Sequence, residues 1–390
     1  MKHISCPGCL DNRTVEFYNV LNAPVHSIVT VTDRKKAMNI PRKEITLAIC
    51  KGCGLIYNSS FDTKTDYHSQ PFEDQQGFSP TFTKFITSIA QSFIDKYNIY
   101  NKKIIEIGCG KGDFLLLISK LGNNIGIGID PAYVEGRIPP NENLSFLKEF
   151  YQEKHGKLPV DAIVCRHTLE HIHDVGNFLN TLHRSLSQKE HVVLLFEVPS
   201  VVRILEEMAF WDIYYEHCTY LSPGSMARLF RLHGFEILNL SLQYNNQYLF
   251  LEAKPGHMNH EKANQLEEDT SELLELAMNF NREVSRIFSY WRSLLLQYKV
   301  EGKKVVLWGG GSKSVGFLTE FSNLNLIEYV IDINPHLAGN FIPGIGLQYQ
   351  QPEFLSEYRP DVVIIMNSVY EKEISLTLNS MGIEPILHSL

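Results

Sequence analysis

The chain is poor in features that mark membrane and nucleic-acid-binding proteins. No apolar run approaches the length needed to span a bilayer, and the first ten residues, MKHISCPGCL, lack the apolar core of a secretory signal. Basic clusters are also missing: the formal charge is −8, and no Lys/Arg run offers the phosphate neutralisation that nucleic-acid binding requires. We therefore expect a cytoplasmic protein with a small-molecule partner and with neither a membrane nor a nucleic-acid partner.

Charge is sparse relative to apolar residues. Hydrophobic residues make up 44% and charged residues 21% of the 390, a balance typical of a globular protein with a large core. A chain of this length is too long to fold around one ordinary hydrophobic core, and so we expect two or three domains. A polar, turn-rich stretch over 59–80 reads as a linker or active-site lid, and 259–299 has helical spacing with no Pro or Gly. We expect an N-terminal lobe with its linker, a core, a helical connector and a C-terminal domain, with bounds 1–75, 76–258, 259–300 and 301–390.

Cysteine is limited to seven residues, and four of them form two pairs. Cys6-Pro-Gly-Cys9 and Cys50-Lys-Gly-Cys53 are both C-x-x-C knuckles, in which a tight turn directs two thiolates at one metal ion. Two such knuckles predict a structural zinc site with four sulfur ligands, for which a small β-rich lobe must bring the pairs together. Redox-active pairs are the alternative. The other three cysteines are single, and each is expected to be a small buried residue.

The middle and the end of the chain alternate between strand-like and helix-like segments. Strands are expected at 103–107, 125–129, 162–165, 191–197 and 235–242, with helical patterns between them. This alternation predicts an α/β fold with a doubly wound parallel sheet. After the connector, KKVVLW, a glycine-rich turn, YVIDINP and a further strand at 362–366 predict a second, smaller Rossmann-like domain.

A glycine motif follows the first of these strands. In IIEIGCGKGDFL, Gly108, Gly110 and Gly112 precede a helix and let the backbone approach a ligand closely. Asp130 ends the next strand, where a carboxylate accepts hydrogen bonds from ribose hydroxyls. A nicotinamide cofactor also fits this pattern. Glu106, an acid within the strand, favours S-adenosylmethionine, because this placement resembles class I S-adenosylmethionine methyltransferases, in which the acid faces the amino-acid end of the cofactor.

Two further segments carry candidate catalytic groups. VDAIVCRHTLEHIHD leaves a strand at the expected ligand crevice, so His171 is placed to touch substrate or cofactor; zinc binding by its histidines is the alternative. FWDIYYEHCTY places Tyr214, Glu216 and His217 among apolar residues, where a desolvated histidine beside a carboxylate is typical of a general base. A buried histidine with a purely structural role is the alternative interpretation.

The order of these motifs resembles one enzyme family over essentially the whole chain. The repeated C-x-x-C, EIGCGKG, HTLEHI, YYEHCTYLSP, GGGSKS and VIDINPHLAGNFIPG together resemble the three-domain C-methyltransferases of deoxysugar biosynthesis. The resemblance implies a zinc-binding lobe, a class I methyltransferase core and a C-terminal Rossmann-like domain, with a nucleotide sugar held between the last two.

The resemblance also assigns roles to single residues. The catalytic base of the family falls on His217, with Tyr214 and Glu216 beside it, and the histidine of its HI turn falls on His171. A tyrosine from the segment after the zinc lobe corresponds to Tyr67.

A C-methyltransferase needs a base, because carbon becomes nucleophilic only after losing a proton next to a carbonyl group. The expected mechanism has His217 remove a proton α to a keto group, with Glu216 fixing its tautomer and with Tyr214 and His171 stabilising the enolate. A methyltransferase acting on oxygen or nitrogen of a small metabolite, or a non-catalytic cofactor-binding protein, are the alternatives.

Overall fold

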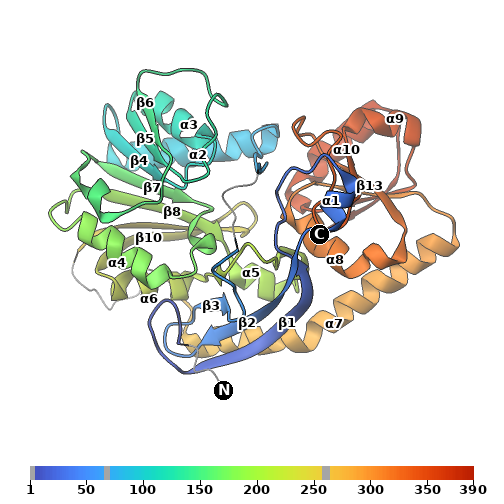
Figure 1. The fold of residues 1–390 in the computed structure, drawn as a ribbon, viewed down its shortest axis with the longest axis horizontal. Helices are drawn as coiled ribbons and strands as arrows, with labels where there is room; N and C mark the ends of the chain where they lie inside the picture. Colours follow the sequence, from blue (N-terminus) through green and yellow to red (C-terminus); the bar gives the residue numbers. More distant parts are fainter. Residues whose placement is uncertain (1–4, 66–70, 257–263) are drawn as a thin grey trace.

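The structure, a computed structural model, describes residues 5–65, 71–256 and 264–390 and contains three sheets (Figure 1). The N-terminal lobe holds an antiparallel sheet in the order β1-β2-β3-β9. Its first three strands are β1 (Thr14–Pro24), β2 (Arg42–Cys50) and β3 (Ile56–Asn58), with α1 (Arg34–Met38) between β1 and β2. The fourth strand, β9 (Thr219–Tyr220), comes from the core, so the segment that contains His217 runs directly into the sheet of the lobe.

The core is a seven-stranded sheet in the order β10-β11-β8-β7-β4-β5-β6. Its strands are β4 (Lys103–Ile107), β5 (Ile125–Ile129), β6 (Leu144–Leu147), β7 (Ala162–Arg166), β8 (Val193–Pro199), β10 (Phe235–Gln243) and β11 (Tyr248–Pro255). Its α-helices are α2 (Pro80–Tyr97), α3 (Asp113–Gly122), α4 (Val175–Ser185), α5 (Val201–Glu206) and α6 (Pro223–Leu232). Short 3-10 turns include η2 (Leu169–His171) and η3 (Phe210–Asp212).

The expectation of a wholly parallel sheet is wrong at one edge. β11 runs antiparallel to β8, and β10 runs antiparallel to β11. The two strands form a hairpin, because only Tyr244, Asn245, Asn246 and Gln247 separate them, and so short a connection cannot make a parallel crossover. The turn has positive φ at Tyr244, Asn245 and Asn246.

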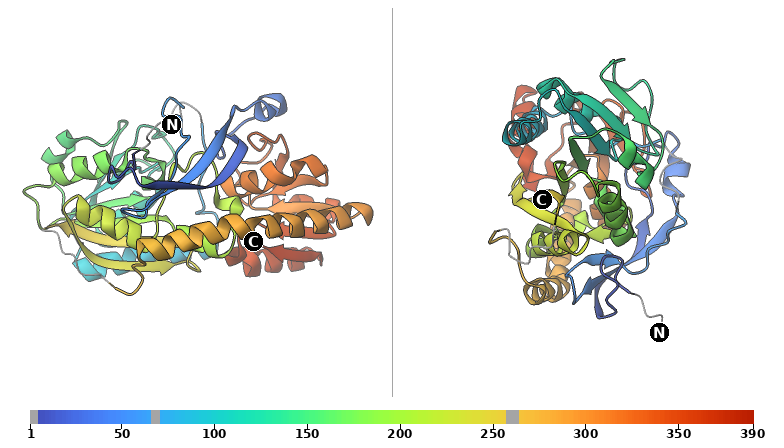
Figure 2. Two further views of the ribbon diagram at one scale, coloured as in Figure 1. Left: turned by 90° about the horizontal axis from the view of Figure 1, so that it is seen from below. Right: turned by 90° about the vertical axis from the view of Figure 1, so that its left-hand side faces the viewer.

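The C-terminal domain is a five-stranded parallel sheet in the order β14-β13-β12-β15-β16. Its strands are β12 (Val305–Trp308), β13 (Ile327–Ile331), β14 (Gln348–Gln350), β15 (Val362–Ile365) and β16 (Ile386–Ser389). Its α-helices are α8 (Ser312–Phe321), α9 (Leu355–Tyr358) and α10 (Glu371–Ser380). The connector contains one long helix, α7 (Thr270–Val300), which runs beneath both the core and the C-terminal domain (Figure 2).

A shared apolar core joins the three bodies. It includes strands of the lobe, α5 and η3 of the core, the buried face of α7, and α8. The ring of Phe210 in η3 lies 4.5 Å from that of Phe288 in α7, and the ring of Trp291 in α7 lies 5.2 Å from that of Phe317 in α8. Because close-packed apolar contacts resist displacement, this shared apolar cluster fixes the position of the seven-stranded sheet relative to the C-terminal sheet.

Among the helices of the described residues, none combines the length and low charge that a bilayer span requires.

Candidate active site

One large cavity lies between the core and the C-terminal domain. Its volume is about 1280 Å³, and it is lined by the loops after β4, β5, β7 and β8, by the corresponding loops of the C-terminal sheet after β12, β13 and β15, and by residues 72–79. In open α/β sheets, ligands bind at the carboxyl ends of the strands, where the strand order reverses. In this chain two such crevices open into the same space, which is large enough for two small ligands.

The glycine loop after β4 forms one wall of the cavity. Gly108 has φ +71°, and a side chain there would collide with Thr168. The backbone N–H of Gly110 donates to Asp130 Oδ2 at 2.8 Å, and that of Ala132 donates to Asp130 Oδ1 at 2.6 Å. These bonds fix the carboxylate at the cavity edge, where its remaining lone pairs are available to a ligand.

Gly112 has a different position from the other two glycines. It is the N-cap of α3, with φ +86°, and is not among the residues that line the cavity. An added Cβ would lie 2.8 Å from the ring of Phe146, so glycine is needed there for packing. Its part in the motif is therefore to begin the helix rather than to face the ligand.

Glu106 forms the floor of the cavity at the end of β4. Its side chain is buried, and Oε2 has no hydrogen-bond partner within the described part of the chain. Burial raises the pKa of Glu106 to about 8, helped by the charges of Asp113 and Asp130 and opposed by Arg166. A cationic donor entering the cavity would satisfy this oxygen and ionise the carboxyl group.

Residues 72–79, part of the stretch predicted to be a linker or lid, line the cavity and contact the glycine loop. Glu73 is the centre of this contact: its Oε2 lies 3.0 Å from Arg137 Nη1, and its Oε1 lies 3.6 Å from Lys111 Nζ. Asn334 of the C-terminal domain donates to Glu73 Oε1 at 3.2 Å. Sequence reasoning missed Lys111 and Glu73, although Lys111 stands inside the glycine motif.

The opposite wall carries the predicted catalytic histidines. A turn closed by the hydrogen bond from His217 N to Tyr214 O (3.2 Å) brings the two side chains together, and Tyr214 Oη lies 3.0 Å from His217 Nε2. His171 Nδ1 lies 2.9 Å from the backbone oxygen of Glu216, and its ring centroid lies 4.9 Å from that of His217. Tyr214, His217 and His171 all line the cavity that Glu106 and Asp130 also line.

The protonation states suit proton abstraction. Burial lowers the pKa of His217 well below its usual value, and the neighbouring His171 and His167 lower it further. Burial also raises the pKa of Tyr214 well above its usual value. At neutral pH, His217 is therefore neutral, so one of its two ring nitrogens carries no proton, and Tyr214 keeps its own proton.

The expected contact between Glu216 and His217 is not found in the described structure. The Glu216 carboxylate points toward the N-terminal lobe, where Oε2 accepts from Ser27 N at 3.1 Å and also from Ser27 Oγ. His26 Nδ1 lies 3.8 Å from Glu216 Oε1. Adjacent residues in the turn point in different directions, so neighbourhood in the sequence does not place this acid against the base.

A charged group that the sequence did not reveal lies beneath the histidines. His167 Nε2 lies 3.1 Å from Glu197 Oε1, and His167 Nδ1 lies 3.5 Å from Glu170 Oε1. Although burial lowers it, these two carboxylates raise the pKa of His167 to about 9, so His167 is charged at neutral pH. Arg166 also bonds to the carboxylate of Glu197. Tyr67, the remaining predicted site residue, lies outside the described residues.

The C-terminal domain contributes the start of α8. Lys313 Nζ lies 3.3 Å from Asp212 Oδ2 and donates to Gln247 Oε1 at 3.0 Å. Arg203 Nη1 donates to the same Asp212 oxygen at 2.8 Å, and Arg203 Nε lies 2.8 Å from Glu207 Oε2, so two cations and two carboxylates balance one another here. Gly311, which is exposed, precedes α8, and the positive end of this helix favours an anionic group in the cavity.

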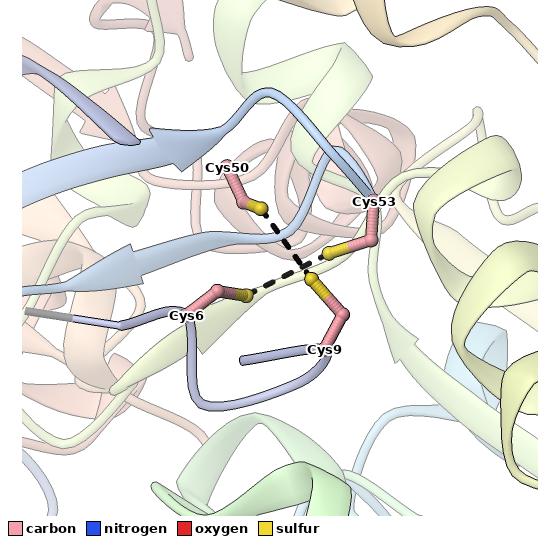
Figure 3. Close-up of side chains that lie close together, drawn as sticks. All are labelled: Cys6, Cys9, Cys50 and Cys53. Atoms are coloured by element: carbon pink, nitrogen blue, oxygen red, sulfur yellow. Dashed lines mark hydrogen bonds between the residues drawn. The ribbon is translucent and has the colours of Figure 1, made fainter. Parts of the chain in front are cut away.

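The four paired cysteines meet in the N-terminal lobe, away from the cavity (Figure 3). Cys6 Sγ lies 3.6 Å from Cys53 Sγ, and Cys9 Sγ lies 3.6 Å from Cys50 Sγ. A disulfide would need about 2.05 Å, whereas a tetrahedral zinc ion with bonds of about 2.3 Å separates its sulfur ligands by about 3.8 Å. The cluster is therefore compatible with one zinc ion.

The cysteine cluster is fastened to the core. Arg228 Nε in α6 donates to Cys53 O at 2.9 Å, and Gly176 N in α4 donates to Pro7 O at 3.0 Å. β3 then pairs with β9, two residues after His217. The lobe consequently supports the segment that carries His217.

Two family models match this chain, one over each of the two domains that line the cavity. A family model described as a methyltransferase domain matches residues 81–240, and one described as a C-methyltransferase C-terminal domain matches residues 253–382. The first includes the glycine loop and His217, and the second includes the loop at Gly309.

Individual relatives are distant. The C-methyltransferase NovU of Streptomyces niveus is 24% identical over 290 residues, covering 70% of this chain and 67% of the relative. The ubiquinone biosynthesis O-methyltransferase of Colwellia psychrerythraea is 23% identical over 201 residues, covering 45% of this chain and 79% of the relative. Among solved structures, magnesium protoporphyrin IX methyltransferase of Synechocystis PCC 6803 has a TM-score of 0.33 at 12% identity, over 50% of this chain and 86% of that one.

Proposed function

The chain is an S-adenosylmethionine-dependent C-methyltransferase with a class I methyltransferase core, and we propose that it methylates a carbon α to a keto group in a nucleotide-linked 4-keto deoxysugar. The observation that carries the proposal is the position of the Tyr214–His217 pair. It faces, in one cavity, both the glycine loop of the core and the start of α8 in the C-terminal domain.

The residues around the glycine loop fit the cofactor. The unpartnered Oε2 of Glu106 would accept from its amino group, and Asp130 would accept from its ribose hydroxyls. Nothing lies within 4 Å of a Cβ added at Gly110, so the loop leaves space for a ligand. When bound, S-adenosylmethionine supplies an electrophilic methyl group on a positively charged sulfur.

The proton is removed by His217, whose neutral imidazole has a free nitrogen. The C–H electron pair remains on the substrate as an enolate, and the proton passes to the ring. Tyr214 stabilises the enolate oxygen by hydrogen bonding, whereas the Nδ1–H of His171 is taken up by the backbone oxygen of Glu216. The enolate carbon held by these residues would then be the nucleophile for the methyl group, and the electron pair of the broken S–C bond would remain with the sulfur of the departing cofactor product.

The other half of the cavity suits the nucleotide portion of the substrate. The positive end of α8 would hold a diphosphate, with Lys313 beside it and the exposed Gly311 leaving room for a close approach.

Solvent exchange tests the proposed chemistry directly. With a panel of nucleotide 4-keto sugars in D₂O and no cofactor, the native protein should exchange one substrate C–H, because only carbon methylation needs that proton removed. His217→Asn should lower exchange and turnover by roughly a hundredfold, the scale of a general base. His173→Asn is the matched control, since His173 lines the cavity but stacks on Phe61. Methyl transfer without C–H exchange would indicate an oxygen or nitrogen acceptor instead.

We also propose that the four cysteines hold structural zinc. Protein purified without chelator should contain one zinc per chain, and Cys50→Ser should lose it and loosen the lobe, because metal binding and folding are coupled at such sites. Metal-free protein with unchanged thermal stability would contradict this assignment.

A further inference from the structure

Within the described residues, Glu170 is a buried carboxylate whose nearest charged partner is His167. Its relative exposure is 2%, and neither Oε1 nor Oε2 accepts a hydrogen bond from the described residues. The nearest charge is His167, whose Nδ1 lies 3.5 Å from Oε1. Because an ionised carboxylate is costly to bury without donors, a group of this kind calls for an explanation.

The position of Glu170 relates it to the catalytic histidine. It lies in η2, and a carboxylate oxygen of Glu170 and ring nitrogens of His171 and His217 all lie within 4.8 Å of one another. The backbone holds this spacing, because Cys218 N donates to Glu170 O at 2.9 Å and Thr219 Oγ1 donates to Leu169 O at 3.2 Å. The residues that follow His217 are thus tied to the turn that carries Glu170.

The Glu216 carboxylate has its partners in the N-terminal lobe. Besides its bonds to the backbone and hydroxyl of Ser27, it belongs to a chain of contacts that continues from Ser27 Oγ to Ser312 Oγ at 2.8 Å. This chain links the lobe, the core and the first residue of α8. These contacts provide hydrogen-bond donors to the Glu216 carboxylate, and His217 is not one of them.

We propose that Glu170, rather than Glu216, is the carboxylate that stabilises the imidazolium formed on His217, and that Glu216 instead joins the three domains. The proposal rests on the role of His217 as the base. When His217 takes the substrate proton, it becomes a cation in a buried site that already contains the charged His167. An anion less than 5 Å away offsets that charge without accepting the proton. Glu170 is therefore a positioning and charge-balancing residue.

Other charged and titratable groups also face His217. His171 and His167 come from the same loop as Glu170, and Tyr214 and Tyr220 come from the segment of His217 itself. His26 and Ser27 of the lobe, and Asp212 with Lys313, lie beyond Glu216 and Tyr214. Among these groups, Glu170 has a carboxylate oxygen within 4.8 Å of a ring nitrogen of His217, and neither of its oxygens accepts a hydrogen bond from the described part of the chain.

A matched pair of variants separates the two acids, with the full-length protein labelled at histidine Cε1. The His217 signal is identified by its loss in His217→Asn, and its pKa is followed by NMR. Glu170→Gln should lower the pKa of His217 by at least half a unit, because removing an anion disfavours the imidazolium, whereas Glu216→Gln should leave this pKa in place and lower the melting temperature. Glu170→Gln should also reduce substrate C–H exchange and turnover by tenfold or more, with the affinity for S-adenosylhomocysteine changed less than twofold.

The outcomes distinguish this inference from the proposed function. If His217→Asn abolishes exchange while Glu170→Gln keeps both the pKa and the exchange of the native protein, only the inference fails. A shift of the His217 pKa in Glu216→Gln alone would return the role to Glu216, and a stoichiometric divalent ion held by Glu170, His171 and His217 would also overturn the proposal. If His217→Asn retains exchange, the proposed base itself is wrong.

Discussion

The two glycine loops of this chain share one backbone design and differ in what fills the space in front of it. Gly108 N and Gly309 N donate to the last residues of the neighbouring strands, Ile129 O at 2.9 Å and Ile331 O at 2.8 Å. Gly110 N bonds Asp130 Oδ2 at 2.8 Å, and Gly310 N bonds Asp332 Oδ2 at 2.5 Å. Both aspartates therefore hold the loop that precedes them.

The difference lies in the side chains around the loops. A Cβ added at Gly110 meets nothing within 4 Å, whereas one added at Gly310 would lie 2.6 Å from the ring of Tyr349. Tyr349 Oη donates to Gly310 O at 3.0 Å, and the position that corresponds to Glu106 is the buried Leu307. The first loop thus keeps an acid and an open space, and the second has an apolar residue and an aromatic ring. Shared backbone geometry does not imply a shared cofactor.

The largest expected effect comes from making the first loop resemble the second. Glu106→Leu should weaken S-adenosylmethionine binding by about a hundredfold, since a hydrogen bond to a charged group contributes roughly 1.5–3 kcal/mol and an ion pair is lost with it. Calorimetric titration measures this change. Leu307→Met is the matched control and should bind the cofactor as the native protein does. Equal binding by Glu106→Leu would remove the distinction between the loops.

The two aspartates provide the next test. Asp130→Ala should weaken cofactor binding by roughly tenfold, because it removes an acceptor worth about 1–3 kcal/mol. Asp332→Ala should leave the affinity unchanged and lower the melting temperature, because it frees the N–H groups of Gly310 and Asn334. A loss of cofactor affinity in Asp332→Ala would show that the second loop binds it too.

The sequence predicts well those features of the two loops that depend only on neighbouring residues. β4, β5 and the glycine motif lie within short segments whose alternation and spacing are set by neighbouring residues, and the strands expected at 103–107 and 125–129 are confirmed with the same bounds. The class I fold is likewise confirmed. The cysteine spacing correctly predicted a cluster of four, because each knuckle is a local turn.

The features that the sequence did not predict depend on contacts between residues that lie far apart in the chain. Glu216 turns toward Ser27, which is 189 residues away, and so the acid beside His217 in the sequence is not beside it in space. The buried Glu170 sits in a motif read for its histidines, and Tyr349 reaches Gly310 across 39 residues. The β10–β11 hairpin was missed because Phe235–Gln243 has the same apolar pattern in a parallel or an antiparallel neighbourhood.

The pH dependence of binding sharpens the contrast at Glu106. Because burial raises its pKa to about 8, the carboxyl group is mostly protonated at pH 7 in the free protein. Cofactor affinity should therefore rise about two- to threefold between pH 7 and pH 8, because ionisation of Glu106 is partly offset as the amino group of the cofactor begins to lose its proton in the same range. Calorimetry across this range measures the slope, and Glu106→Gln should have little slope. A native affinity that is flat over this interval would show that Glu106 does not face the cation.

The smallest expected effect concerns the ring that fills the second loop. Tyr349→Phe removes only the hydrogen bond from Oη to Gly310 O and should cost about 1 kcal/mol of unfolding free energy, the usual net worth of a neutral hydrogen bond. Burial raises the pKa of the Tyr349 phenol well above its usual value, so the hydroxyl remains a donor throughout the working range. Cofactor affinity should not change, because the ring itself stays in place. Denaturant unfolding checks the stability, and calorimetry checks the affinity. If Tyr349→Phe weakened cofactor binding, the second loop would be part of the cofactor site, and the difference between the loops would lie in ligand orientation rather than in occupancy.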